Sequence, residues 1–552
     1  MKKKISLSFA NPAVVLAVIL TLAVSFNPAL AAEGHVLRMA CKYSDAKSLD
    51  AHRATGSQDR LVVELVFNGL LRYRPGNLSV DAIIPDLAVE IPSPRILADG
   101  RQQWVFKLKQ GVMTHPFSGN PGYELTTEDV IYSFQRAADP KWSSFSIDYS
   151  GITFEALDKY TLQVTVDKPL SANLFLPKFS NRGGGLIVAK RAVEEKGNEW
   201  FKTHPVGTGP FVFQKYIPRE KVVLTRNTKF FRGSPKLGGV ELYYMPSVSS
   251  RELALQKGEL DVIEGPKEQA WGEKMAKIPG IEVESISSAE TIVAHFNMTV
   301  KPLNRLKVRQ AIAYAMNRKE FVAVYGPNVS SPIYSIVPVG RMIAGLSREE
   351  VAREDLLYEY NLSRAKKLLA EAGYPNGFSL EVFTSKSSTY RRAYELMQAQ
   401  LRRIGIDLKL SVVDHSAFHA RIRQNLNPIV FYACMRPNPD VILTQFYHSD
   451  SIVVTGKKAI TNFSHIGEVD ADGDGKIDSV DDLIIRARTE KDPGRQVALW
   501  KEAQLVLLRK LASYPIITVG YLFARNPKVD WGYEMVTITD GPKPTENTTI
   551  RK

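Results

Sequence analysis

The sequence predicts an α/β protein with more than one hydrophobic core. Short apolar segments typical of strands, such as Trp104–Leu108 and Thr161–Val166, alternate with segments of helical periodicity such as 305–318. Alternation of this kind over the whole length is typical of layered α/β folds. The chain has 552 residues, 44% of them hydrophobic, which is enough for two or three cores.

The first residues have the pattern of a secretory signal. Three lysines at positions 2–4 precede an apolar stretch, 14–24, and the small residues Ala29 and Ala31 fit a cleavage site. The alternative is an uncleaved anchor helix, but the apolar stretch is short for a bilayer span and ends at Pro28. We therefore expect residues 1–31 to be removed near Ala31 and the mature protein to be soluble and exported.

The charge of the chain bears on whether it binds nucleic acid. The formal net charge is +14, and the basic residues are spread along the chain instead of forming a basic arm. A solvated basic surface explains this better than nucleic-acid binding, so no nucleic-acid partner is expected.

Cys41 and Cys434 are the only cysteines. In an oxidising compartment they form either one disulfide or two separate buried thiols, and their spacing does not decide between these.

Several local signals predict where elements begin and end. The apolar run 61–73 has a helix-like pattern, and Thr126 opens a capping-box-like helix start that should close at Asp139-Pro140. Further on, Ser363 is a good N-cap for a helix that Gly373 can end in the left-handed conformation.

The stretch 428–448 combines a buried strand with a displayed loop. Its apolar, β-prone start ends in two aromatic residues, Phe431 and Tyr432, and breaks at Pro437 and Pro439. Side chains after such a strand lie where α/β proteins usually bind ligands. The candidate ligand residues here are Tyr432, Met435, Arg436, Asn438 and Asp440. A plain strand-to-helix turn is the alternative interpretation.

The segment 470–481, DADGDGKIDSVD, has the spacing of a calcium loop. Carboxylates at alternating positions and a glycine at the turn suit a hard cation that prefers oxygen ligands. The predicted ligands are Asp470, Asp472, Asp474, the carbonyl of Lys476, Asp478 and Asp481. Aspartate replaces the longer glutamate at the last position, which favours a structural Ca²⁺ over a switching one. An acidic turn without metal is the alternative.

Motifs for catalysis are missing from the sequence. There is no Gly-x-Ser-x-Gly elbow, no His-Glu-x-x-His pair and no Walker loop. His415 and His419 share one helix face, but zinc would need further ligands, so surface or packing roles are favoured. We expect no enzyme.

A succession of segments resembles one known family. It includes NGLLRY at 68–73, LTTEDVIYSFQRAADP at 125–140, HPVGTGPFVFQKY at 204–216, LALQKGELDVIEG at 253–265 and YNLSRAKKLLAEAGYPNGFSLEVF at 360–383. In this order the segments are similar to the extracellular solute-binding proteins of ABC importers, of the dipeptide/oligopeptide-binding type, over nearly all of the mature chain.

The resemblance implies a two-lobed, type II periplasmic-binding-protein fold with a hinge, an interlobe ligand cleft and an extra domain. Lobe I would comprise 32–69, 202–296 and 515–552; the extra domain, 70–201; and lobe II, 297–514. Crossings between lobes are expected near 201–212, 294–300 and 510–518. The polar tail 541–552 is expected to be loose.

The implied function is capture of a peptide or similar solute, by a monomer, for delivery to an ABC permease in the inner membrane. The alternatives are a ligand-presenting receptor for a membrane sensor and a binder of a non-peptide solute such as an anion or a metal chelate. In the resembled family, the neighbourhood of Asn181, Arg182 and Gly183 and the loop containing Ser44 border the ligand.

The resemblance also predicts an unusual ligand. Peptide-binding members carry an aspartate for the peptide's α-amino group at the position of Met435, and Met435 cannot offset an ammonium. Arg436 would bind a carboxylate or phosphate, point to solvent or pair with Asp440. Ordinary dipeptides should therefore bind weakly, and anionic or amine-free solutes are preferred.

Overall fold

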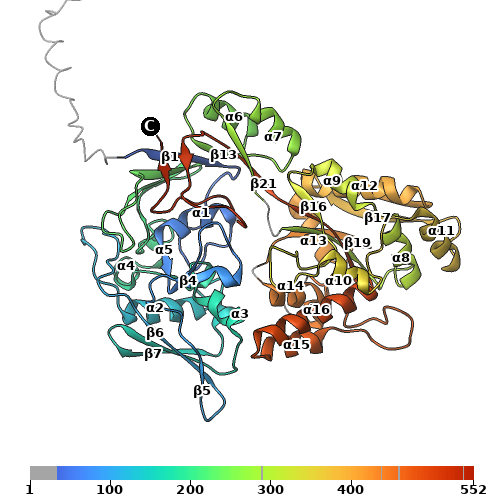
Figure 1. The fold of residues 1–552 in the computed structure, drawn as a ribbon, viewed down its shortest axis with the longest axis horizontal. Helices are drawn as coiled ribbons and strands as arrows, with labels where there is room; N and C mark the ends of the chain where they lie inside the picture. Colours follow the sequence, from blue (N-terminus) through green and yellow to red (C-terminus); the bar gives the residue numbers. More distant parts are fainter. Residues whose placement is uncertain (1–33, 287–289, 437, 458–460, 539, 552) are drawn as a thin grey trace, which may run out of the picture. The chain divides into compact units, whose positions relative to one another are not determined.

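The computed structural model describes residues 34–286, 290–436, 438–457, 461–538 and 540–551 (Figure 1). Gly34–Lys552 form one unit by their contacts. The predicted signal peptide, residues 1–31, lies outside the described residues. Within the described part, no helix is both long and apolar enough to cross a membrane.

Lobe I is built on a seven-stranded mixed sheet. Its strands, in spatial order, are β10 (Phe211–Ile217), β11 (Lys221–Arg226), β12 (Gly239–Tyr244), β1 (Val36–Cys41), β13 (Val262–Glu264), β21 (Tyr521–Arg525) and β14 (Glu282–Ile286). β1 is parallel to both of its neighbours, whereas β21 is antiparallel to β13 and β14. A strand from near the end of the chain is thus inserted between two earlier strands.

The remaining lobe I elements pack against this sheet or extend it. They are α1 (Ser57–Val66), α4 (Lys190–Lys196), α5 (Asn198–Phe201), α6 (Val248–Gln256), α7 (Gln269–Ala276), and the pair β22 (Val529–Asp530) and β23 (Thr549–Ile550). The tail predicted to be loose is therefore tied down: β23 pairs with β22, and Arg551 forms an ion pair with Asp530.

The extra domain has its own sheet and core. Its elements are β2 (Asn68–Gly69), β3 (Leu71–Tyr73), η1 (Val80–Ala82), β4 (Ile83–Pro85), β5 (Arg95–Ile96), β6 (Gln102–Lys107), α2 (Thr127–Ala138), η2 (Ser146–Tyr149), β7 (Ile152–Asp158), β8 (Thr161–Val166), α3 (Ala172–Phe175), η3 (Leu176–Phe179), η4 (Gly183–Gly185) and β9 (Leu186–Ile187). The sheet order is β5-β6-β8-β7, and Trp104 stacks on Phe175 with ring centres 4.0 Å apart.

The separate core of this domain ends earlier than the predicted boundary at residue 201. Its buried cluster runs from Leu70 to Ile187, while Val193 and Phe201 of α4 and α5 pack into the lobe I core. The sequence does not mark this change, because both segments are apolar.

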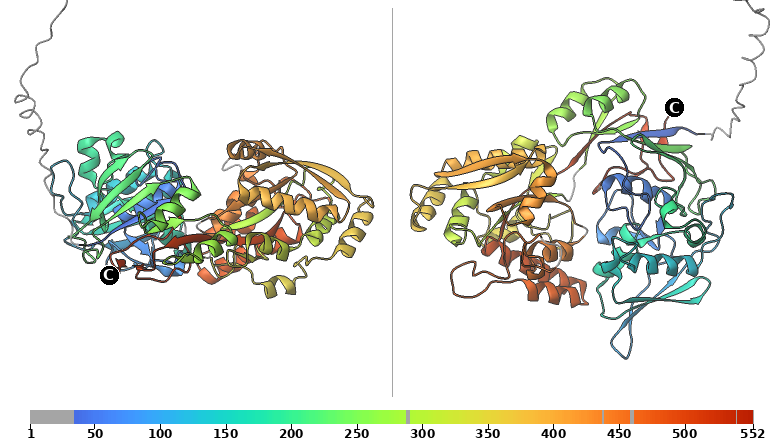
Figure 2. Two further views of the ribbon diagram at one scale, coloured as in Figure 1. Left: turned by 90° about the horizontal axis from the view of Figure 1, so that it is seen from above. Right: turned by 180° about the vertical axis from the view of Figure 1, so that it is seen from behind.

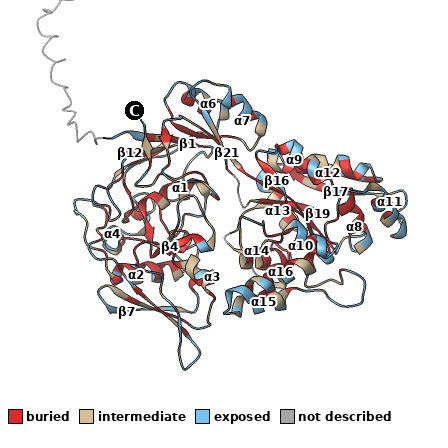
Figure 3. Ribbon diagram, viewed as in Figure 1, coloured by how far each residue is buried: buried red, intermediate tan, exposed pale blue. Residues whose placement is uncertain are grey.

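Lobe II contains a four-stranded sheet, a parallel strand pair and most of the helices. The strands are β16 (Ser330–Pro332), β20 (Ser513–Val519), β15 (Thr291–Phe296) and β19 (Ile429–Cys434) in the sheet, and β17 (Phe378–Ser385) and β18 (Ile406–Val413) in the pair. The helices are α8 (Leu306–Ala315), α9 (Arg318–Tyr325), α10 (Arg348–Arg353), α11 (Leu362–Glu371), α12 (Ser388–Arg402), α13 (His415–Arg423), α14 (Pro439–Tyr447), η5 (Ser449–Ser451), α15 (Asp481–Thr489) and α16 (Pro493–Arg509). Buried residues concentrate on the sheet and the inner helix faces (Figure 3).

Two chain segments change from one large sheet to the other. β14 lies in the lobe I sheet and β15 in the lobe II sheet, and β20 and β21 exchange sheets at Gly520 (Figures 1 and 2). A Cβ at Gly520 would lie 2.6 Å from the carbonyl oxygen of Ile286, so the two segments approach closely here. The predicted boundaries, 297 and 514, lie at the end of β15 and inside β20. Every residue of both strands is buried, polar ones such as His295 and Ser513 included, so neither boundary is marked by a change to a polar, exposed pattern.

Among the predicted helix ends, those at Thr126 and Gly373 are confirmed, and those for 61–73 and Ser363 are wrong. Thr126 caps α2 as predicted, and its side chain accepts the Glu128 N–H. Gly373 has a φ of +85°, as expected for a helix C-terminus. The run 61–73 is wrong as one helix, because α1 ends at Val66 and the chain then forms β2 and β3. The cap of α11 is Asn361 and not Ser363: the Asn361 Oδ1 accepts the Arg364 N–H at 2.9 Å.

Candidate functional site

The interlobe cavity has a volume of about 910 Å³ and is lined by residues of lobe I, the extra domain and lobe II. This volume is within the range of small-molecule sites. Six Arg or Lys and four Asp or Glu side chains line it, an excess of two positive charges. A smaller cavity, of about 100 Å³, lies between lobe I and the extra domain.

The strand-to-helix turn after β19 forms one wall of this cavity. β19 ends at Cys434, and α14 begins at Pro439 with Asn438 as its N-cap. The Asn438 Oδ1 accepts the Val441 N–H at 2.9 Å, and Pro439 fits the first helical position because no N–H is needed there. The segment is thus both a plain turn and part of the cavity wall. Tyr432, Met435, Arg436, Asn438 and Asp440 all line the cavity.

Arg436 presents a guanidinium to the cavity without a carboxylate partner among the described residues. Its Nε donates to the Gln445 Oε1 at 2.5 Å and its Nη1 to the Met435 carbonyl oxygen at 3.0 Å. The guanidinium lies 5.3 Å from the ring centre of Phe446. These neutral contacts orient the group but leave its charge uncompensated.

Asp440 pairs with Arg488 instead of Arg436. The Arg488 Nε lies 3.3 Å from the Asp440 Oδ1, and Nη2 donates to Thr444 at 2.7 Å. Burial raises the pKa of Asp440, and Arg488 only partly offsets this. The predicted alternative of an Arg436–Asp440 pair is therefore wrong, because α15 brings a closer guanidinium to Asp440.

The opposite wall contains a network of paired charges, here called the paired-charge wall. Arg60, Arg182 and Asp540 line the interlobe cavity, and their partners Glu64 and Lys543 line the smaller cavity. Arg60 donates to both oxygens of Asp540, at 2.8 and 2.7 Å, and Arg182 lies 3.5 Å from Asp540. Glu64 accepts from Lys543 and lies 3.7 Å from Arg182. Burial would raise the pKa of Asp540, but the Arg60 hydrogen bond and the Lys543 and Arg182 charges outweigh burial and hold that pKa well below its usual range.

The glycine-rich turn places Gly183 and Gly184 in the cavity wall next to Arg182. Gly183 has a φ of +57°, and a Cβ at Gly184 would lie 2.5 Å from the Tyr149 ring. Only glycine fits this close approach. Asn181 points elsewhere: its Oδ1 accepts the Tyr73 N–H at 3.1 Å, and it lines the smaller cavity. Ser44 is exposed and lines neither cavity.

The lobe II wall, called here the Arg436 wall, also contains residues that the sequence did not assign to the site. Tyr390, His415 and His419 line the cavity beside Tyr432, Met435 and Arg436. The two imidazole rings lie edge to face, 4.5 Å apart, and His415 Nδ1 is 2.9 Å from the Ser385 Oγ. Burial, reinforced by His415 and Arg423, lowers the pKa of His419 to about 4. The helical spacing of the pair was visible in the sequence, but the cavity it faces was not.

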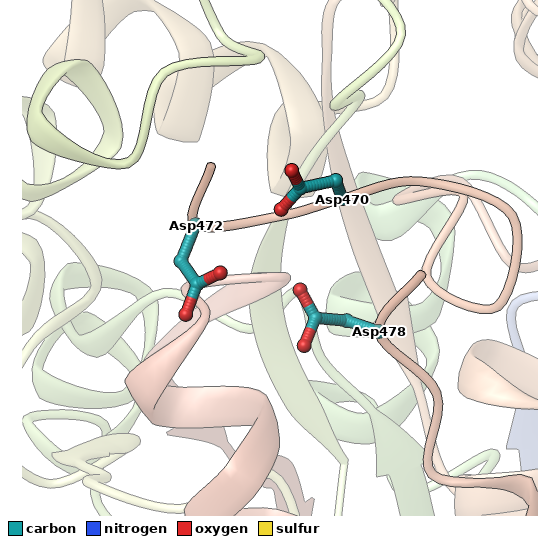
Figure 4. Close-up of side chains that lie close together, drawn as sticks. All are labelled: Asp470, Asp472 and Asp478. Atoms are coloured by element: carbon teal, nitrogen blue, oxygen red, sulfur yellow. The ribbon is translucent and has the colours of Figure 1, made fainter. Parts of the chain in front are cut away.

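Three of the predicted calcium ligands gather in the acidic loop, as Figure 4 shows. The carboxylates of Asp470, Asp472 and Asp478 have ligand atoms within 4.8 Å of one another. Lys510 donates to Asp472 and lies 2.7 Å from Asp478. Asp470 accepts the N–H groups of Gly473 and Gly475 at 2.7 and 2.8 Å.

The other predicted ligands lie apart from this cluster. Asp474 accepts the Lys476 N–H at 2.9 Å, and both residues are exposed. Asp481 accepts the Ser449 N–H at 3.0 Å, so its carboxylate is used at the start of η5. The described residues therefore bring together half of the predicted calcium ligands.

Cys41 is buried and Cys434 half-buried, and both thiols are free. Of the two alternatives that the sequence left open, the structure contains separate thiols. Cys434 lines the cavity, and burial raises the pKa of its thiol to about 11.

Two α/β lobes joined by crossing strands, with a ligand-sized cavity between them, define a periplasmic binding protein. The family model of the bacterial extracellular solute-binding proteins, family 5, matches residues 82–452. The chain belongs to this family. It is the periplasmic solute-binding component of an ABC importer and captures a peptide or similar small solute.

Relatives with known names cover nearly the whole chain. The di/tripeptide-binding protein 2 of Pseudomonas aeruginosa is 26% identical over 85% of this chain and 87% of that protein. MoaA of A. tumefaciens R10, solved with mannopinic acid, is 35% identical with a TM-score of 0.76, covering 94% of this chain and 100% of that one. DppA of Helicobacter pylori, solved with the peptide STSA, is 26% identical with a TM-score of 0.72, covering 94% and 98%.

Proposed function

We propose that the solute of this binding protein is an anion and that Arg436 binds its carboxylate. The observation that carries the proposal is the guanidinium of Arg436, which lines the interlobe cavity without a carboxylate partner among the described residues. A charged group that is partly buried favours a charged partner over water, and a guanidinium fits a carboxylate with two parallel hydrogen bonds.

The same wall disfavours a peptide with a free amino end. Met435 is the residue next to Arg436 and offers polarizable packing but no charge for an ammonium. All four carboxylates that line the cavity have a cationic partner within 4.0 Å: an arginine for Asp440 and Asp540, and a lysine for Asp148 and Glu290. MoaA, the relative that is 35% identical, was solved with mannopinic acid, which supports an acidic solute that is not a simple peptide.

Identification of the natural solute tests this proposal. Native mass spectrometry of the purified protein gives the mass of any co-purified solute, and titration calorimetry compares mannopinic acid with dialanine. We expect mannopinic acid to bind at least tenfold more tightly than dialanine. Dialanine binding of equal or greater affinity would contradict the proposal.

Export and closure complete the proposed cycle. We propose that residues 1–31 direct export, that the mature protein is a monomer, and that the lobes rotate about the chain crossing at Gly520, between β20 and β21, when solute binds. Gly520 supports this because it has no side chain where the crossing segments approach. X-ray scattering should give the mass of a monomer and a smaller radius of gyration with solute. An unchanged radius would argue against closure.

We also propose a structural Ca²⁺ in the acidic loop. The 470–481 spacing and the gathered carboxylates of Asp470, Asp472 and Asp478 support it. Lys510 contributes a positive charge at these carboxylates and would compete with the ion. Asp481, held at Ser449, is left out of the proposed ligand set.

Calorimetry with Ca²⁺ alone tests the loop. We expect binding that Asp470→Asn abolishes and Lys510→Met strengthens, because the variant removes a competing cation. Asp482→Asn is the matched control, since Asp482 is an exposed neighbour paired with Arg486. No heat of binding, together with a melting temperature that a chelator leaves unchanged, would contradict the proposal.

A further inference from the structure

The short helix α3 of the extra domain makes a buried polar contact with lobe II. The Ser171 Oγ donates to the Gln496 Oε1 at 2.7 Å, and the Asn173 Nδ2 donates to the same oxygen at 3.1 Å. Gln496 lies on α16 and is fully buried, and its Nε2 donates to the Ala487 carbonyl oxygen at 2.7 Å. The buried Gln496 Oε1 therefore has its protein hydrogen-bond donors only while α3 is docked on lobe II.

Ser171 makes this contact in place of the hydrogen bond that usually caps a helix N-terminus. It occupies the N-cap position of α3, where a serine hydroxyl usually accepts a backbone N–H of the first helical turn. Here the side chain makes no capping hydrogen bond, because its hydroxyl points to Gln496. The sequence choice at this position therefore serves the contact between domains.

The apolar residues of α3 are divided between two cores. Phe175 belongs to the buried cluster of the extra domain, where it stacks on Trp104. Leu174, one position earlier, belongs to the lobe II cluster, whose other members all lie between Ile292 and Val519. The backbone before the helix is fixed to the extra domain, since Gln102 exchanges two hydrogen bonds with Leu170. The helix is thus anchored on one domain and inserted into the other.

The same segment lines the interlobe cavity. Leu170, Leu174, Pro177 and Lys178 are all in its wall. Figure 1 shows α3 facing α15 and α16, away from the crossing strands that join the lobes. A solute in the cavity therefore meets α3 at the side where the two domains are not covalently linked.

We propose that Ser171, Asn173 and Leu174 form a latch, here called the α3 latch, by docking on lobe II at Gln496. The latch closes this side of the cavity and limits the solute to one that fits inside. A peptide that extends past this side of the cavity would separate the Ser171 and Asn173 donors and Leu174 from their lobe II partners. The proposal concerns solute size and retention, and it holds whether or not the solute is anionic.

Hydrogen exchange on the full-length protein without added solute tests the latch directly. Gln496→Ala removes the lobe II acceptor, and we expect the α3 amides of Leu174 and Phe175 to exchange about tenfold faster, as the loss of two neutral hydrogen bonds implies. Ser171→Ala/Asn173→Ala removes the donors from the other side without touching the lobe II core. Ser133→Ala is the control, because it removes a buried hydroxyl that bonds only within the region of α2 and β9. Unchanged exchange in both latch variants overturns the proposal.

Ligand size is tested with N-acetylated alanine peptides of two to six residues and with mannopinic acid as probes. The wild type should lose affinity at least tenfold between the shortest and longest peptide, and the latch variants should show a smaller loss. Dissociation of mannopinic acid should be about tenfold faster in the latch variants than in Ser133→Ala. A wild type that binds the six-residue peptide as tightly as the two-residue peptide would refute the size limit. If no probe binds the wild type, the exchange experiment decides, and the failure then concerns the proposed anionic solute.

Discussion

The two walls of the interlobe cavity use their charges differently. On the paired-charge wall, Asp540 accepts two hydrogen bonds from Arg60 and lies near Arg182 and Lys543, so the buried carboxylate is compensated several times. On the Arg436 wall, the guanidinium rests on Phe446 and Gln445 and has no carboxylate partner among the described residues. Both walls contain arginine, but only one wall leaves its charge for a solute.

This difference separates structural from ligand-binding charge. A buried ion pair costs desolvation and holds two segments in one arrangement, and removal of one partner leaves an uncompensated charge. Arg60 and Asp540 are separated by 480 positions and join α1 to the C-terminal segment. The Arg436 guanidinium is oriented only by neutral groups, so its charge does not join two segments of the protein. That charge instead contributes binding free energy when an anionic solute binds.

The largest expected effect comes from breaking the paired-charge wall. Asp540→Asn leaves the half-buried Arg60 without its carboxylate, and we expect a loss of about 3–5 kcal/mol in the free energy of unfolding. Urea denaturation followed by tryptophan fluorescence measures it. Asp148→Asn is the control, since its partner Lys178 lies 3.9 Å away and Asp148 is half exposed; it should cost less than about 1 kcal/mol. Equal effects would remove the distinction between the walls.

The sign of the pH dependence follows from the same carboxylate. The pKa of Asp540 is lower in the folded than in the unfolded protein, so its contribution is fully present above the unfolded pKa of about 4. It is lost as the pH falls below that value toward the folded pKa. Asp540→Asn should therefore destabilise the protein most at neutral pH and progressively less below pH 4.

A loss of binding without a loss of stability is expected on the other wall. Arg436→Met should weaken mannopinic acid or the identified anionic solute by roughly 10- to 100-fold, the range for a charge-assisted hydrogen-bonded pair. The free energy of unfolding should change by less than about 1 kcal/mol, because only neutral contacts and the Phe446 ring are lost. Calorimetry and urea denaturation of the same preparation measure both quantities. The opposite pattern would mean that Arg436 is structural.

Met435→Asp would convert the Arg436 wall into a paired one. The new carboxylate can pair with Arg436, so we expect anion affinity to fall by about tenfold and dialanine affinity to rise, since an ammonium then finds a charge. Met435→Asn has the same shape without the charge and serves as the control. If both variants behave alike, the charge at this position does not determine the solute.

The smallest expected effect is a flat pH profile. Burial lowers the pKa of His419 to about 4, so this imidazole on the Arg436 wall stays neutral between pH 7.5 and 5.5. The dissociation constant of mannopinic acid should vary less than about twofold over that range, because the charge of this wall does not change there. A step near pH 6.5 that disappears in His419→Gln would show that His419 gains a positive charge in this range and would contradict the expectation.

Much of the fold could be predicted from the sequence because the residues that determine these elements lie close together in the chain. The capping box at Thr126, the left-handed Gly373 and the break after β19 each depend on residues close in sequence. The errors concern choices between neighbours or between distant partners. Asn361 and Ser363 are both good caps, and the apolar run 61–73 splits because Asn68 pairs with Asp86 and Thr208, whose distance in sequence hides the contact.

The candidate site was predictable on one wall only. Met435, Arg436 and Asp440 follow a buried strand, and that pattern places them at the cavity. The partner of Asp440 is Arg488 and the partners of Asp540 are Arg60 and Arg182, and no periodicity in the sequence brings these residues together. Asn181 and Ser44 were assigned by neighbourhood, which cannot tell which side of a turn a side chain occupies.

The place of β21 in the lobe I sheet has a consequence for how the protein is made. β13 and β14 are synthesised more than 230 residues before the strand that joins them, Tyr521–Arg525. Lobe II, from β15 to β20, is contiguous in the chain and has all its strands before β21 emerges. Chain synthesis therefore completes the second lobe before the first, and the lobe I sheet keeps two unpaired strand edges until the last few dozen residues arrive. A protein truncated after residue 519 would keep every strand of lobe II, but its lobe I sheet would lack β21 between β13 and β14.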